Sequence, residues 1–155
     1  MAIKMKYVLA SKNAHKAEEI RAILGGDYEI ITQTDAGAGD IEVIEDGKTF
    51  EENAVKKAVQ IMQATGLPAI ADDSGLAVDA LNGAPGIYSA RFAGKDATDE
   101  ENLQKLLREL EDVTLDKRQA KFVCVIAIAV PESNEVKTYR GECAGRLLTE
   151  KRGEN

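Results

Sequence analysis

The sequence predicts an α/β fold in which a mixed central sheet is flanked by helices. Short apolar segments alternate with segments of helical apolar spacing along the first 110 residues, and a strongly apolar run near residue 120 precedes a turn and a second strand-like run. Strands and helices in this order, with a hairpin last, are typical of a mixed sheet covered by helices. At 155 residues the chain is expected to form a single domain.

The N-terminal third is predicted to hold two strands around one helix. The first strand is expected over residues 6–10 and the helix over residues 14–24, with Asn13 as its N-cap. Four apolar residues at helical spacing are expected to face the core: Ala17, Ile20, Ile23 and Leu24. The second strand is expected over residues 28–31. The polar segment 33–48 is long enough to indicate a binding loop or an irregular strand.

Two further helices carry the same start signal, a hydroxyl residue followed three residues later by Glu. Thr49 and Glu52 have this spacing before a helix expected over residues 49–64, and Thr98 and Glu101 repeat it before a helix that ends near residue 110. Each helix also has an apolar stripe. The stripe of the later helix consists of Leu103, Leu106, Leu107 and Leu110.

The C-terminal part is predicted to form a hairpin. Residues 120–130 are the strongest strand signal, residues 131–135 read as a turn, and residues 136–143 read as the returning strand. A short apolar piece follows over residues 145–148. Asn-Gly at residues 82–83 is a turn signal earlier in the chain.

Two adjacent carboxylates interrupt an apolar run in the middle of the chain. Residues 68–71 read as a buried strand and residues 76–81 as another apolar segment, so Asp72 and Asp73 are expected where a sheet ends and a tight turn begins. Neighbouring residues of an extended chain point to opposite faces, so one Asp can hold a cation while the other addresses another group. The alternative is an ordinary Asx turn with positive φ at Gly75.

Composition limits the classes of partner. Acids outnumber bases by 27 to 20, for a net charge of −7, which argues against binding to polynucleotides or anionic membranes. Neither a signal peptide nor a membrane span is expected, which predicts a cytoplasmic protein. Cys124 and Cys143 are expected to be reduced, partly buried thiols rather than a disulfide or redox pair, and the single His15 argues against a catalytic triad.

Two helix starts carry cations. The first helix has His15 and Lys16 in its first turn, where acids are normally favoured, which fits either a phosphate cradle or a solvated lysine. On the second helix, Lys56 is spaced to pair with Glu52 and Lys57 with Asn53, which fits an exposed helix face. Together with Glu45, Asp72 and Asp73, these lysines could surround one metal-bound polyphosphate. A Walker-type P-loop is absent from the sequence.

Four segments, in order and at natural spacing, resemble the inosine triphosphate pyrophosphatases, the Ham1-like non-canonical purine nucleoside triphosphatases. They are SKNAHK, EDGKTFEENAVKKA, ADDSGLAVDALNGAPGIYSARFAG and ATDEENLQKLL. The resemblance implies an elongated, two-lobed α/β fold with a central cleft, and a homodimer. It also implies Mg2+-dependent, house-cleaning hydrolysis of purine nucleoside triphosphates such as ITP, dITP and XTP to monophosphate and pyrophosphate.

The same resemblance implies roles for individual residues. Glu45 and Asp72 would hold Mg2+, and Asp73 would orient and deprotonate the attacking water. Lys16 and Lys56 would neutralise the triphosphate, and the remaining substrate contacts would come from Ser11, Asn13 and Ser74.

The resemblance ends at the C-terminus. The family continues past the equivalent of residues 153–155 with segments that bind the purine, and these are lacking here. We expect either a shortened chain or a surface that another copy covers. An inactive nucleotide-binding fragment or interaction module therefore remains the alternative function. A Maf-type pyrophosphatase would carry an Arg pair where this chain has Asn-Ala-His-Lys.

Overall fold

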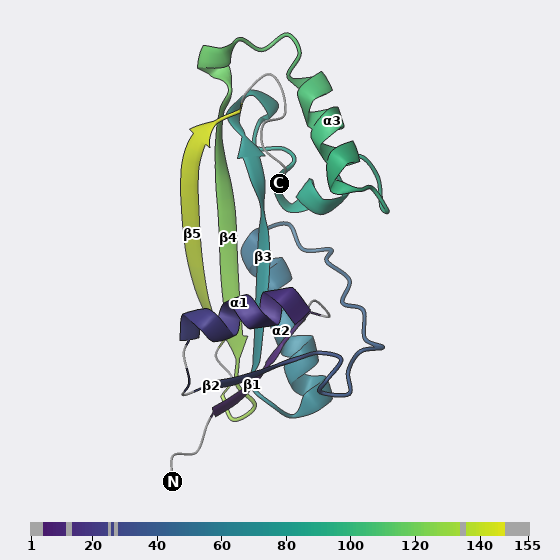
Figure 1. The fold of residues 1–155 in the computed structure, drawn as a ribbon, viewed down its shortest axis with the longest axis vertical. Coiled ribbons are helices and arrows are strands. Elements are labelled where there is room, and N and C mark those ends of the chain that lie inside the picture. The colour runs from purple at the N-terminus through teal and green to yellow at the C-terminus, as the bar shows by residue number, and fades with distance from the viewer. Residues whose placement is uncertain (1–4, 12–13, 25, 27, 134–135, 148–155) are drawn as a thin grey trace. The chain divides into compact units, whose positions relative to one another are not determined.

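Five strands form one sheet in the order β2-β1-β3-β4-β5. The structure is a computed structural model that describes residues 5–11, 14–24, 26, 28–133 and 136–147. β1 is parallel to both β2 and β3, and Figure 1 shows β4 running opposite to β3 and β5. The mixed α/β class is therefore confirmed. The strands are β1 (Met5–Leu9), β2 (Tyr28–Thr32), β3 (Ala69–Val78), β4 (Gln119–Ala129) and β5 (Val136–Arg146).

The chain divides into two compact units. The first combines the described residues up to Asp73 with Val125–Tyr139, and the second combines Ser74–Cys124 with the described residues from Arg140 onward. Strands β3, β4 and β5 each contribute residues to both units. The single 155-residue domain stays a prediction.

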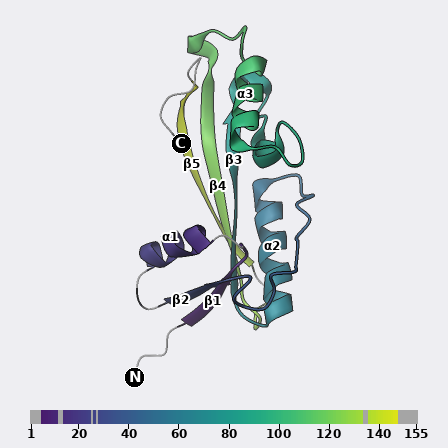
Figure 2. The ribbon, with the colours of Figure 1, turned by 45° about the vertical axis from the view of Figure 1, so that its right-hand side comes forward.

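In the first unit, helices cover both faces of the strands. Figure 2 shows α1 (Ala14–Leu24) and α2 (Phe50–Thr65) on opposite sides of β1 and β2. Adjacent strand residues alternate between them: Leu9 and Ile70 belong to the cluster that contains Ala17 of α1, whereas Val8 and Ala69 pack with Ile61 of α2. This alternation is the period of two that an extended chain imposes.

Both predicted helices of this unit are confirmed, with one wrong detail. Thr49 caps α2 by accepting a hydrogen bond from the Glu52 N–H at 3.0 Å, and Gly66 ends it with a left-handed φ of 70°. In α1, Ala17 is fully buried but Ile23 is 78 % exposed. Ile23 instead borders an apolar cavity of about 290 Å3. The other lining residues are Tyr7, Ile20, Tyr28, Ile70, Ile126, Ile128 and Tyr139.

The prediction that the sheet ends at the two acids is wrong. β3 continues without interruption through Asp72, Asp73, Ser74 and Gly75 to Val78. The Asx-turn alternative is wrong as well, because these residues are extended and Gly75 is not among the glycines with positive φ. Charged side chains are tolerated in the middle of a strand when partners reach them, since a paired buried charge costs far less than an isolated one.

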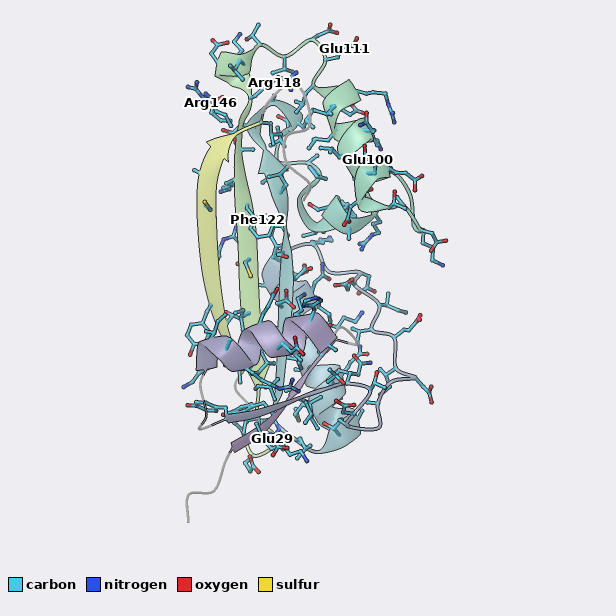
Figure 3. All side chains as sticks on the ribbon, viewed as in Figure 1. Glu29, Glu100, Glu111, Arg118, Phe122 and Arg146 are labelled. Carbon is cyan, nitrogen blue, oxygen red and sulfur yellow. The ribbon has the colours of Figure 1, made fainter. Side chains whose placement is uncertain are left out.

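The second unit is built on α3 (Asp99–Glu109), whose capping box is complete. The Thr98 hydroxyl accepts from the Glu101 N–H at 3.1 Å, and the Glu101 carboxylate accepts from the Thr98 N–H at 2.9 Å. Arg118, labelled in Figure 3, is 2 % exposed and donates to the carbonyl of Val113 at 2.9 Å, which secures the turn after the helix. The buried cluster comprises Val78, Leu106, Leu110 and Ala120.

The predicted hairpin is confirmed in outline, with a longer second strand. β5 runs to Arg146 and so includes the start of the short apolar piece at residues 145–148, and Leu147 packs against the buried cluster of the second unit. Cys124 and Cys143 are both reduced in the structure; Cys124 is partly buried, whereas Cys143 is exposed. Residues 148–155 lie outside the described residues. Within the described part of the chain, each helix is too short or too polar to cross a membrane.

Candidate functional site

The two acids of β3 face opposite sides of the sheet, as the sequence predicted. The carboxylate of Asp72 lies 2.8 Å from the Nζ of Lys16 on α1, whereas that of Asp73 lies 4.0 Å from the Nζ of Lys57 on α2. The reason is the alternation of strand residues between the two helices. A single dipeptide thus presents one charge to each helix.

Lys16 has a partner for its unusual position. The first turn of α1 contains no acid, so this lysine stands at the end of the helix dipole that repels cations. Asp72 compensates from the neighbouring strand. The Lys16 side chain remains 39 % exposed, so its ammonium group is still accessible to an anion.

Lys57 is the centre of an acidic cluster. Its Nζ lies 2.9 Å from Oε1 of Glu45 and 4.0 Å from Oδ1 of Asp73, and it also donates to the backbone carbonyl of Asp72. Its side chain is only 17 % exposed. Cation and carboxylates therefore meet within the first unit, in a setting where their charges interact more strongly than in water.

Sequence reasoning chose Lys56 for this place and noted Lys57 only as part of an exposed helix face. In the structure Lys56 pairs with Asp46, whose side chain is 68 % exposed. This lysine lowers the pKa of Asp46. Helical spacing could have placed Lys57 on the buried side of α2, because Lys57 is four residues after the buried Asn53 and four before the buried Ile61. The phosphate role assigned to Lys56 stays a prediction.

Asp73 is an acid of this cluster with a perturbed carboxyl. Burial raises its pKa above the ordinary value, with smaller upward contributions from Glu45 and Asp72, while Lys57 and a hydrogen bond from Asn53 oppose the shift. Its side chain is 12 % exposed. Its Oδ2 is buried and has no hydrogen-bond partner among the described residues. A buried carboxylate oxygen in this state is ready to accept a water or a cation.

A polar cavity of about 320 Å3 opens beside this cluster. Glu45 and Lys57 contribute to its wall, so the charged groups face open space rather than packed core. Gln33 closes the adjoining loop by donating to the carbonyls of Ala38 and Ile41, at 2.9 and 2.6 Å. The remaining lining residues are Ala10, Glu42 and Val43.

The other predicted site residues are placed as follows. Ser11 lies two residues after the end of β1, and its carbonyl accepts from the N–H of Gln33 at 3.1 Å. Asn13 lies outside the described residues. Ser74 follows Asp73 on β3 but belongs to the second compact unit. The substrate contacts predicted for these three residues stay predictions.

Of the two predicted metal ligands, Glu45 pairs with Lys57, which also donates to the backbone carbonyl of Asp72, whereas the carboxylate of Asp72 faces Lys16 on the other side of the sheet. Over the described ranges, no group of three or more His, Cys, Asp and Glu residues is arranged as a ready metal site. Mg2+ commonly binds proteins through only one or two carboxylates and keeps several waters. The unpartnered Oδ2 of Asp73, which shares Lys57 with Glu45, supplies a carboxylate oxygen that fits this mode.

Comparisons with known proteins identify relatives along almost the whole chain. A dITP/XTP pyrophosphatase of Desulfotalea psychrophila is 52 % identical over 149 residues, which cover 96 % of this chain and 65 % of the relative. That of Shigella flexneri is 58 % identical over 122 residues, covering 78 % of this chain and 61 % of the relative. The matched part thus spans somewhat less than two thirds of these two relatives.

Solved structures show the same relationship. The Ham1 proteins of Staphylococcus aureus and Coxiella burnetii superpose with TM-scores of 0.87 and 0.88. Each is 44 % identical over 97 % of this chain, which corresponds to 76 % and 77 % of the respective structures. The model of the Ham1 family matches residues 7–155. On this evidence, the chain belongs to the Ham1 family.

Proposed function

We propose that this protein hydrolyses non-canonical purine nucleoside triphosphates, namely dITP, XTP and ITP, to nucleoside monophosphate and pyrophosphate. The observation that carries the proposal is Asp73, a partly buried carboxylate with one unpartnered oxygen beside Lys57, which also pairs with Glu45. The names of the relatives, dITP/XTP pyrophosphatases, support the choice of substrate.

Asp73 is suited to act as the general base. A carboxyl whose pKa is raised holds a proton more readily than an ordinary aspartate, which helps it to accept one from an attacking water. Its unpartnered Oδ2 can orient that water by accepting a hydrogen bond. The water oxygen would then bond to the α-phosphorus, its proton would pass to Asp73, and the bond from the α-phosphorus to the departing pyrophosphate would break.

The lysines are suited to bind the polyphosphate. Phosphoryl and nucleotidyl transfer depend on positioning and on neutralising charge rather than on covalent chemistry by the protein. Lys16 is accessible, and Lys57 lines the cavity beside the acids. We therefore assign Lys57, rather than Lys56, as the cation of α2 that faces the substrate.

Glu45 and Asp72 would hold Mg2+, which would supply positive charge to the phosphate oxygens. Asp72 pairs with Lys16 and Glu45 pairs with Lys57, so the lysines assigned to the phosphates lie next to the acids that would hold the metal. The homodimer implied by the sequence resemblance stays a prediction.

The test is pyrophosphate release from dITP, XTP and ATP in the presence of Mg2+. We expect release from dITP and XTP, and Asp73→Asn should reduce it by about 10² to 10⁴-fold. Asp112→Asn, the same substitution at an exposed position, should leave it unchanged. Nucleotide binding without release by the unsubstituted chain would instead support the nucleotide-binding module.

A further inference from the structure

Asn53 is a polar side chain at the centre of the inner face of α2, and it is 1 % exposed. Its Oδ1 accepts a hydrogen bond from the backbone N–H of Gly47 at 2.8 Å. Its side chain also interacts with Asp73 on β3, where it opposes the raised pKa of that carboxyl. Asn53 therefore links the loop before α2 to the strand that carries the acids.

The loop is packed tightly against this side chain. A Cβ atom on Gly47 would lie 2.7 Å from Oδ1 of Asn53 and 2.8 Å from Cβ of Glu52, closer than real Cβ atoms come. Only glycine lets the backbone approach α2 this closely. Close packing of the loop against α2 therefore helps to keep the Gly47 N–H in hydrogen-bonding distance of Asn53.

Asn53 and Lys57 stand one turn apart on α2 and make parallel connections. Lys57 reaches Glu45 on the loop and Asp73 on β3, while Asn53 reaches Gly47 on the loop and Asp73 on β3. Attraction to an ammonium group has little directional preference, whereas an amide fixes the orientation of the group it bonds. The amide can therefore set which way the carboxylate of Asp73 points.

We propose that Asn53 is a positioning residue: its carbonyl oxygen holds the Gly47 backbone and its amide holds Asp73, so that Glu45 and Asp73 keep one fixed arrangement. The inference rests on the proposed function and adds a residue that contacts neither phosphate nor metal. Positioning of this kind commonly changes activity 10- to 100-fold. It also accounts for a polar side chain among buried residues of α2 that are otherwise apolar.

The variants Asn53→Asp and Asn53→Ser separate the two contacts. The aspartate retains an oxygen for Gly47 but replaces the amide donor with an acceptor, and the serine is too short for both bonds. We expect kcat to fall about 10- to 100-fold in each, with KM for dITP within about threefold of the unsubstituted chain.

Glu52→Ala is the matched control. Glu52 precedes Asn53 on α2, and its Oε2 accepts from the N–H of Lys48 at 2.6 Å, so it ties down the same loop without a contact to Asp73. We expect kcat of this variant to stay within about twofold. An equal loss in Glu52→Ala, or full kcat in Asn53→Asp, would overturn the inference. So would the loss of a cooperative thermal transition in both Asn53 variants, because Asn53 would then be a folding residue.

Nuclear magnetic resonance tests the positioning role of Asn53 independently of activity. Hydrogen exchange of the Gly47 amide should accelerate at least tenfold in Asn53→Ser and remain slow in Asn53→Asp. The 13C resonance of the Asp73 carboxyl should shift in both Asn53 variants and stay in place in Glu52→Ala. If the unsubstituted chain releases no pyrophosphate, the proposed function fails. The spectra would still show whether Asn53 connects the Gly47 backbone to Asp73.

Discussion

Replacing each of the two adjacent lysines of α2 by glutamine is the most discriminating test of the site. Lys57 is 17 % exposed and bonded to Glu45 and to the Asp72 carbonyl, whereas Lys56 pairs only with the exposed Asp46 among its described contacts. The two substitutions are chemically identical and one residue apart. Any difference between them therefore reports on surroundings alone.

The expected cost of Lys57→Gln follows from its distances. At an effective dielectric constant of about 20, unit charges 4 Å apart attract by about 4 kcal/mol. Lys57 has carboxylates at 2.9 and 4.0 Å, but the desolvation of the lysine and the partial exposure of Glu45 offset much of this attraction. We expect a loss of about 2 kcal/mol, which lowers the midpoint of thermal unfolding by about 4 to 8 °C for a chain of this size.

Activity should separate the two variants more sharply than stability. Loss of a stabilising cation at the phosphate site should reduce pyrophosphate release by about 10² to 10³-fold in Lys57→Gln. Lys56→Gln should keep its unfolding midpoint and lose no more than a few-fold in rate. Circular dichroism melts and the release assay measure both quantities. A large loss of rate in Lys56→Gln together with normal rates in Lys57→Gln would refute the assignment of Lys57.

Three further predictions concern stability. Asp73→Asn should melt at or above the temperature of the unsubstituted chain at pH 7. Because the pKa of Asp73 is raised in the folded state, the carboxyl contributes stability at low pH and loses that contribution as pH rises through the folded-state pKa. The neutral amide of the variant avoids this loss. A clearly lower melting temperature of the variant would contradict the prediction. Ile23→Ser should change the free energy of unfolding by less than about 0.5 kcal/mol because the side chain is 78 % exposed, whereas Ile20→Ala, which packs against the buried cluster, should cost about 1 to 3 kcal/mol in urea titrations. Thr98→Ala should cost about 1 kcal/mol by removing the N-cap of α3, and an unchanged urea midpoint would argue against that cap.

Local signals in the sequence were sufficient for the elements themselves. Capping residues such as Thr49 and Thr98 located the starts of α2 and α3, and helical spacing identified the buried face of each. The alternation of an extended chain also predicted that Asp72 and Asp73 point to opposite faces. These features depend on neighbours within a few residues, so the sequence records them directly.

Features that depend on distant partners were decided only by tertiary structure. The acids looked like the end of a strand because an isolated strand has nothing to neutralise them, yet β3 continues because α1 and α2 bring Lys16 and Lys57 to its two faces. Ile23 has a core-like position in its helix but lies at an open cavity.

The choice between Lys56 and Lys57 has the same origin. Helical spacing predicts which side of α2 a residue is on. The order of strands in the sheet and the path of the loop before α2 decide which groups that residue contacts. Asn53 shows this most clearly, because its partners Gly47 and Asp73 come from two separate segments that only folding brings together. Periodicity is a property of one element, whereas a site is made where several elements meet.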